Sequence, residues 1–185
     1  GWIDASALTY KITRLPDSIV VAETTTGNEY IDNSITKLNI YSYQIQAITP
    51  DGAGPTATTD RLVMGPALTV PYRCNFATDD QFALWNVIDA NNDKYTWKRE
   101  TTLAAAYYYY NEDGETGGDD WLVSSPIHLE KDKIYRLKFK LQSYDVGYPE
   151  KVAVHLGTGA SVAEQTTLLG DYEIESNTFV EYKVI

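Results

Sequence analysis

The sequence predicts an all-β protein, and three observations support this fold class. The composition is rich in aromatic residues, with 15 Tyr, 4 Trp and 4 Phe against one Met, and β-branched residues are abundant; both kinds pack better on a sheet than in a helix. Several segments alternate apolar and polar residues at the two-residue period of a strand. Residues that favour turns, namely Gly, Pro, Asn and Asp, separate these segments.

The first third of the chain predicts short strands joined by turns. Residues 8–15 alternate at period two, residues 16–18 form a Pro-Asp-Ser turn and residues 19–22 are extended, so we expect a hairpin there. Residues 50–55 are rich in Pro and Gly and predict a loop. Further extended segments are expected at residues 30–32, 40–48 and 56–63.

Residues 64–71 predict a junction, because they contain a glycine and two prolines and because the strand pattern restarts at Tyr72. We therefore expect two domains, at residues 1–66 and 67–185. The second has a Gly-rich acidic loop at residues 111–120. Its expected strands lie at residues 72–76, 85–88, 95–98, 121–129, 134–141, 152–157 and 179–184.

Two blocks in the first domain resemble the fibronectin type III family. Residues 41–47 read Tyr-x-Tyr-x-Ile-x-Ala and precede Asp-Gly-x-Gly at 51–54, similar to that family's F strand and F–G turn, with Tyr41 in the position of the tyrosine corner. Residues 8–14 resemble its strand C. About two strands precede this point in a complete module, so the resemblance implies a partial fibronectin type III sandwich.

Three blocks in the second domain resemble the cleaved-adhesin domain of bacterial surface haemagglutinins and gingipain-type adhesins. Residues 85–97 read Trp-x-x-Ile-Asp-Ala-x-x-Asp-x-x-x-Trp, residues 119–129 read Asp-Asp-Trp-Leu-Val-x-Ser-Pro-Ile-x-Leu, and residues 133–139 read Lys-x-Tyr-x-Leu-x-Phe. The resemblance implies a galactose-binding-like jelly-roll β-sandwich that holds structural Ca²⁺. That family usually ends in an aspartate-rich closing motif, which this sequence lacks before Ile185, so we expect a truncated jelly roll.

Charge and cysteine content exclude several classes of partner and site. With 15 Lys and Arg against 26 Asp and Glu, the net charge of −11 would repel nucleic acid, and an acidic surface suits Ca²⁺. No apolar run approaches the roughly 18–20 residues of a membrane span, so we expect no membrane insertion. Cys74 is the single cysteine, which rules out an intrachain disulfide, and we expect it to be a small buried apolar residue.

A candidate metal site lies at Asp89, Asn91 and Asp93. Their side-chain oxygens come at alternate positions, a spacing with which a tight loop can wrap Ca²⁺, although the loop lacks the glycine and distant glutamate of an EF-hand. The alternative is a polar turn whose side chains accept hydrogen bonds from its own backbone amides.

A candidate ligand-binding patch lies at four consecutive tyrosines, residues 107–110, beside the acidic loop. Alternation in a strand sends two of them to each face, so one pair is exposed unless the far face is covered. The alternative is that these tyrosines pack over the sheet. The candidate ligand contacts are Tyr108, Tyr110, Asp113 and Asp119.

Three tryptophans, Trp85, Trp97 and Trp121, have indole faces on which a sugar could stack, but their framework positions favour a place in the core. Catalysis has little support, because the two histidines lie in expected strands and no G-x-S-x-G motif or phosphate-binding loop occurs. We expect a non-enzymatic protein.

The sequence therefore predicts a secreted or cell-surface adhesin segment, bacterial by its resemblance, that binds carbohydrate or a host extracellular protein. The alternative is an accessory non-catalytic module of a secreted hydrolase or peptidase, and a purely structural stalk also remains open. Because sheet edges are expected to be missing at both ends, a strand-exchanged homo-oligomer is a further expectation.

Overall fold

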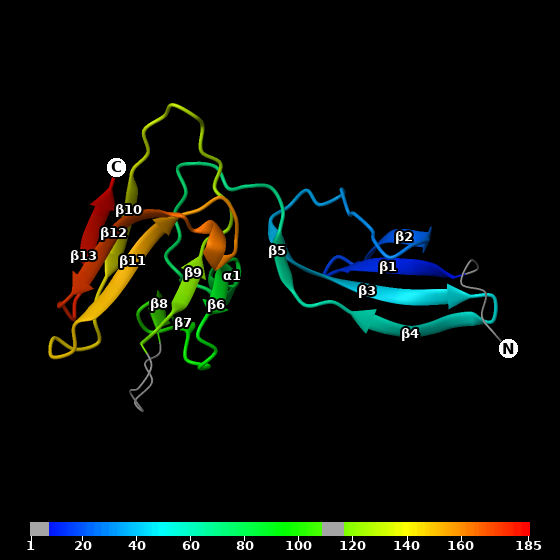
Figure 1. Ribbon diagram of the computed structural model, residues 1–185, viewed down its shortest axis with the longest axis horizontal. Helices are drawn as coiled ribbons and strands as arrows, with labels where there is room; N and C mark the ends of the chain where they lie inside the picture. The colour runs from blue at the N-terminus through cyan, green and yellow to red at the C-terminus, as the bar shows by residue number, and fades with distance from the viewer. Residues whose placement is uncertain (1–7, 109–116) are drawn as a thin grey trace. The chain divides into compact units, whose positions relative to one another are not determined.

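The computed structural model describes residues 8–108 and 117–185 (Figure 1). The described residues are mostly antiparallel β-strands, with one short α-helix and one 3₁₀ turn, which confirms the all-β fold class. The chain divides into two compact units. The first comprises Gly1–Ala67, Cys74–Trp85 and Arg99–Ala106, and the second comprises Leu68–Arg73, Asn86–Lys98 and Tyr107–Ile185. The division into domains 1–66 and 67–185 stays a prediction.

The first unit contains one sheet with the strand order β2-β1-β3-β4, and β5 pairs with the early part of β3. In this sheet Ile12 lies opposite Ile45 and Tyr10 lies opposite Ala47, so the apolar residues of β1 and β3 share one face. The strands are β1 (Thr9–Leu15), β2 (Ile19–Thr25), β3 (Asn39–Thr49), β4 (Gly52–Thr58) and β5 (Leu62–Met64).

Tyr41 anchors the start of β3. Its ring is buried, and its hydroxyl donates a 2.9 Å hydrogen bond to the Lys37 carbonyl, four residues upstream. This is the backbone contact that a tyrosine corner makes. Membership of the fibronectin type III family stays a prediction.

A buried ionic network crosses the same face of the sheet. Arg14 of β1 lies 2.7 Å from Asp17 and 3.0 Å from Asp32. Asp32 also accepts hydrogen bonds from the Tyr43 hydroxyl and from the backbone and hydroxyl of Ser34. Burial raises the pKa of Asp32, but these hydrogen bonds and the one from Arg14 outweigh it and lower the pKa to about 2. The segment after β2 is thereby fastened to β1 and β3.

The turn after β3 is shorter than the sequence predicts. We expected a loop over residues 50–55, but β4 begins at Gly52, whose φ of 126° closes a tight connection. Pro55 is accommodated because β4 is an outer strand of the sheet, where an amide need not donate to a ladder. The single strand expected over residues 56–63 is divided between β4 and β5.

Helix α1 (Asp79–Ala83) belongs to the first unit and begins at a capped turn. Thr78 is the N-cap and accepts a hydrogen bond from the Gln81 amide, while Asp79 and Asp80 occupy the first turn, where negative charge is favourable. Asp79 also pairs with Arg99 at 2.6 Å. Asp79 and Asp80 therefore form the start of a helix.

The second unit is built from the antiparallel strand pairs β6–β9, β10–β13 and β11–β12. Strands β7 and β8 pair with each other in a separate hairpin. A 3₁₀ turn, η2 (Val162–Glu164), precedes β12. The strand bounds are β6 (Asn86–Asp89), β7 (Trp97–Glu100), β8 (Ala105–Tyr108), β9 (Asp120–Val123), β10 (Leu137–Leu141), β11 (Glu150–Leu156), β12 (Thr167–Ile174) and β13 (Val180–Val184).

An aromatic cluster joins two of these pairs. Phe139 of β10 stacks on Tyr182 of β13, with ring centroids 5.8 Å apart, and both rings meet Tyr172 of β12 edge to face. Ile174, at the end of β12, is the most buried large apolar residue of the unit, at 2% exposed. The β10–β13 and β11–β12 pairs therefore share a core (Figure 1). The galactose-binding-like jelly-roll topology stays a prediction.

Several expected strands differ from the observed ones. Residues 72–76 form no strand, although Tyr72, Cys74 and Phe76 are half-buried and alternate with exposed neighbours as expected. The strand expected at residues 134–141 begins only at Leu137, and Ile134 is exposed. Strand β12 was not expected. Within the described residues, no helix is long and apolar enough to cross a bilayer.

Strand β2 is an outer strand of its sheet, and its Ile19 and Val20 are exposed. Because an open edge can pair with another chain, we expect concentration-dependent self-association of the purified protein, measured by sedimentation velocity. A single monomeric species over roughly a hundredfold concentration range would contradict this expectation.

Candidate metal and ligand site

The loop after β6 folds on itself through its acidic side chains. Asp89 accepts hydrogen bonds from the amides of Asp93 (3.2 Å) and Lys94 (2.8 Å), and Asp93 accepts one from the Tyr95 amide (2.8 Å). The Asn91 amide group donates to Asp93 and to the Gly117 carbonyl. The structure thus shows the polar turn that was one of the two alternatives. Because a carboxylate accepts about four hydrogen bonds or metal contacts, the turn retains lone pairs for a cation.

Asp120, the first residue of β9, lies directly opposite Asp89 in the β6–β9 pair. Both of its carboxylate oxygens are buried, and neither has a hydrogen-bond donor within the described part of the chain. Like charges directly opposite one another destabilise a sheet, and a buried carboxylate without partners is costly. The environment of Asp120 is therefore unfavourable to its charged form.

Two hydroxyl groups lie beside Asp120. Burial first, and then the charges of Asp89 and Asp93, raise the pKa of Asp120, while the nearby Thr96 and Tyr108 hydroxyls lower it. The Thr96 oxygen is itself buried without a hydrogen-bond partner among the described residues. Burial, followed by the charge of Asp120, raises the pKa of Tyr108 to about 12.

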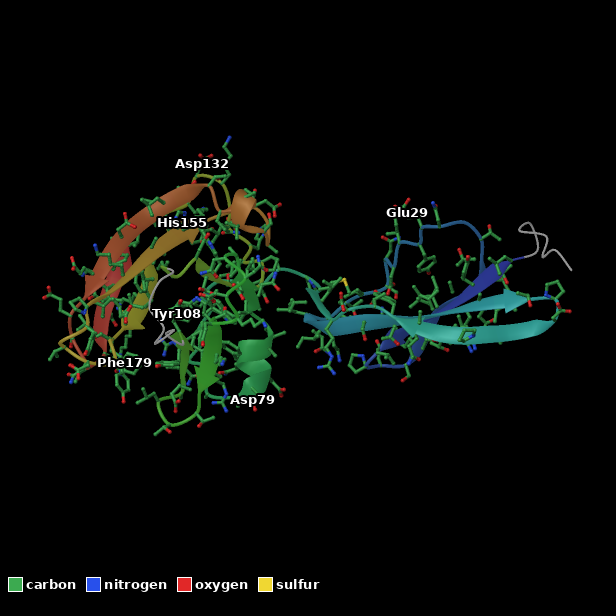
Figure 2. The ribbon with its side chains drawn as sticks, turned by 60° about the horizontal axis from the view of Figure 1, so that its bottom comes forward. Glu29, Asp79, Tyr108, Asp132, His155 and Phe179 are labelled. Atoms are coloured by element: carbon green, nitrogen blue, oxygen red, sulfur yellow. The ribbon has the colours of Figure 1, made fainter. Side chains whose placement is uncertain are left out.

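Gly118 allows Tyr108 to approach the acidic cluster. A Cβ atom at Gly118 would lie 2.6 Å from the Tyr108 hydroxyl oxygen, so any larger residue would displace that side chain. The Tyr108 ring packs edge to face on Trp97, at 5.9 Å, and the Trp97 indole donates to the Asp120 carbonyl. Tyr108 therefore lies among the side chains of the second unit (Figure 2).

The other predicted ligand residues are placed differently. Asp119 is exposed and accepts a 2.8 Å hydrogen bond from the Trp121 indole, whose ring packs edge to face on His155. Tyr110 and Asp113 lie outside the described residues. A ligand-binding role for these residues and for Tyr108 stays a prediction.

The tryptophans are half-buried and packed, as expected of core residues. The ring centroids of Trp85 and Phe76 lie 5.1 Å apart. The Trp97 indole donates a hydrogen bond to the Asp120 carbonyl, and the Trp121 indole donates one to the Asp119 carboxylate. None of the three is an open platform for a sugar ring.

The structure thus brings together Asp89, Asn91 and Asp93 from the predicted metal site with Tyr108 from the predicted ligand site. Asp120 and Thr96 complete this cluster, and the sequence did not predict either of them as a site residue, because Asp120 falls at the end of the expected acidic loop at residues 111–120. The sequence carried no clear signal for Asp120, because the apolar residues that follow it, Trp121, Leu122 and Val123, do not alternate with polar ones.

No group of three or more His, Cys, Asp or Glu side chains among the described residues forms a ready metal-ligand set. The donors near Asp120 are carboxylate, amide and hydroxyl oxygens, which is the ligand chemistry of Ca²⁺ and not of zinc. The donor atoms of the cluster are therefore of the kind that a hard cation binds, but they do not form a complete set of metal ligands.

No known protein family, no curated protein and no solved structure matches this chain.

Proposed function

We propose that this chain is a non-catalytic binding segment of a bacterial protein that is secreted or displayed at the cell surface, and that it binds carbohydrate or a host extracellular protein. In this proposal a structural Ca²⁺ ion supports the second unit. The observation that carries the proposal is the buried Asp120 carboxylate, which lies opposite Asp89 with no hydrogen-bond donor among the described residues. The resemblance of residues 85–139 to cleaved-adhesin domains supports the same function.

A calcium ion would relieve the unfavourable charge of the cluster. Asp89, Asp93 and Asp120 would supply carboxylate oxygens and Asn91 an amide oxygen, which are ligands that Ca²⁺ accepts. When bound, the ion would supply positive charge beside the Asp89, Asp93 and Asp120 carboxylates. The Thr96 and Tyr108 hydroxyls lie beside the same carboxylate.

The Ca²⁺ concentration outside cells would suffice to fill a weak calcium site. Ca²⁺ sites in extracellular modules have a Kd of about 10⁻⁴–10⁻³ M. Such a site fills only where free Ca²⁺ is in the millimolar range, which is the condition outside cells. The acidic composition, with a net charge of −11, suits the same environment.

Thermal unfolding with Ca²⁺ and with a chelator tests the proposal. At free Ca²⁺ about 100-fold above Kd, we expect the free energy of unfolding of the second unit to rise by about 2.7 kcal/mol, because only the folded state binds the ion. Unfolding monitored by calorimetry measures this rise. The absence of any shift at saturating Ca²⁺ would remove the ion from the proposal.

An Asp120→Asn variant makes the test specific. In chelator we expect it to be more stable than the wild type at neutral pH, because the folded pKa of Asp120 is raised and its charged form is disfavoured by folding. The wild type in chelator should accordingly lose stability as the pH rises through that pKa. With Ca²⁺ the variant should gain little, whereas the control Asp171→Asn, at an exposed position of β12, should respond like the wild type.

A further inference from the structure

The loop that joins β10 to β11 presents two tyrosine rings to solvent (yellow in Figure 1). Tyr144 is 85% exposed and Tyr148 is 73% exposed, and Val146 between them is also exposed. Neither ring stacks on another ring or donates a hydrogen bond within the described part of the chain. Tyrosines that only cover a sheet are expected to pack on it, so these two rings are available to a partner. We call residues 144–148 the aromatic loop.

Hydrogen bonds at both ends hold the aromatic loop in one shape. Ser143, 1% exposed, donates from its amide to the Ser176 carbonyl at 2.8 Å and from its hydroxyl to the Asp145 carbonyl at 3.2 Å. The Asp145 carbonyl also accepts a hydrogen bond from the Tyr148 amide, and the Asp145 side chain accepts one from the Gly147 amide. A loop fixed in this way loses little conformational freedom when a ligand binds.

A third exposed aromatic residue lies at the same end of the unit. Phe179 immediately precedes β13, and the next residue, Val180, pairs with Leu141 at the end of β10 (Figure 2). The bond between Ser143 and Ser176 ties the β12–β13 connection to the aromatic loop. Two neighbouring connections therefore present three aromatic rings, with polar backbone and side chains between them.

Between the two tyrosines in the sequence lies Asp145, whose carboxylate is a hydrogen-bond acceptor. Asp145 is exposed, and one of its carboxylate oxygens accepts from Gly147, which leaves the other without a donor among the described residues. Exposed rings that lie close along the chain to an exposed carboxylate match a ligand with apolar C–H faces and hydroxyl donors. Asp145 is the single charged residue of the aromatic loop, so a sulfated, phosphorylated or sialylated ligand would meet a like charge there.

We propose that the aromatic loop is a carbohydrate-binding site for neutral pyranose sugars, with Tyr144 and Tyr148 stacking on sugar rings and Asp145 accepting from sugar hydroxyls. This inference rests on the proposed function and names its ligand class and contact residues. It assigns recognition to residues other than those of the Asp120 cluster, so variants of the two groups can be tested separately.

An array of neutral and acidic glycans, followed by titration calorimetry with the neutral glycan that binds best, tests the inference on the full chain in calcium. We expect Tyr144→Ala and Tyr148→Ala each to weaken binding roughly tenfold, and Tyr144→Phe to retain most of it, because stacking requires the ring and not the hydroxyl. The control Ile134→Ala removes another exposed apolar side chain of the same unit and should bind as the wild type does.

Each alternative outcome is distinct. If a neutral glycan binds and both alanine variants bind it equally well, the site assignment is wrong while the proposed function stands. If only acidic glycans or Lys-rich peptides bind, the ligand class is wrong. If no glycan binds, the inference fails, and the proposed function survives only as binding to a host protein.

Discussion

Replacing Arg14 by alanine is expected to lower the free energy of unfolding of the first unit by about 3–5 kcal/mol. The Arg14 and Asp32 side chains are 5% and 6% exposed and lie 3.0 Å apart. Without Arg14, the Asp32 charge would remain buried with only neutral donors from Ser34 and Tyr43. Removing one partner of a buried ion pair lowers stability by far more than the intact pair contributes, because the remaining charge cannot regain its hydration.

Urea denaturation of the wild type and the variant measures this loss. The control is Lys138→Ala, which removes a salt bridge of 3.2 Å between two half-exposed side chains, Lys138 and Glu181. Exposed pairs of this kind contribute about 0–1 kcal/mol, so the control should unfold close to the wild type. Equal effects of the two substitutions would show that the Arg14 network is not buried in solution.

The same network predicts a pH dependence with a defined sign. The folded pKa of Asp32, about 2, lies below its ordinary value, so the folded state binds this proton less tightly than the unfolded state. Its contribution to stability is complete above the ordinary value and is lost as the pH falls toward about 2. In the Arg14→Ala variant one charged donor is gone, so this acid-induced loss should begin at higher pH.

Replacing Ile174 by alanine is expected to lower the free energy of unfolding of the second unit by about 2–5 kcal/mol. Ile174 is 2% exposed at the end of β12, beside the aromatic cluster of Phe139, Tyr172 and Tyr182 by its place in the strand. Its removal would leave a cavity that packed rings cannot readily close, and the cost of such a cavity adds to the lost apolar burial.

The matched control for Ile174 is Leu168→Ala in the same strand. Leu168 is 51% exposed, so its truncation should change stability by about 0.5 kcal/mol or less. Calorimetry that resolves two unfolding transitions should assign the Arg14 effect to one and the Ile174 effect to the other. If Leu168→Ala destabilised the protein as much as Ile174→Ala, the assignment of Ile174 to the core would be wrong.

Local pattern was sufficient where a strand has one buried and one exposed face. Residues 8–15 and 40–48 alternate cleanly, and they became β1 and β3 with nearly the expected bounds. Strand β12 was missed because Leu168 and Leu169 are adjacent and Gly170 interrupts the segment, which breaks the two-residue period. It is a strand because β11 supplies its hydrogen-bond partners, through a register that shifts between Val154 and His155.

The candidate site shows the same division. Sequence spacing singled out Asp89, Asn91 and Asp93, and the structure folds them into one turn. It did not single out Asp120, because acidic pairs such as Asp119 and Asp120 are usually solvated, and only pairing with β6 places Asp120 against Asp89. Nor did it distinguish Tyr108, half-buried, from Tyr144 and Tyr148, which are exposed.

By itself, the sequence determined the all-β class, the position of the main alternating strands and the turn-forming chemistry, because these depend on residues that are near neighbours along the chain. The tertiary structure alone decided that Asp120 loses its hydration, that Arg14 is buried and that Tyr144 and Tyr148 face solvent. Burial and cross-strand pairing bring together residues that are far apart in the chain, and no local period records that proximity.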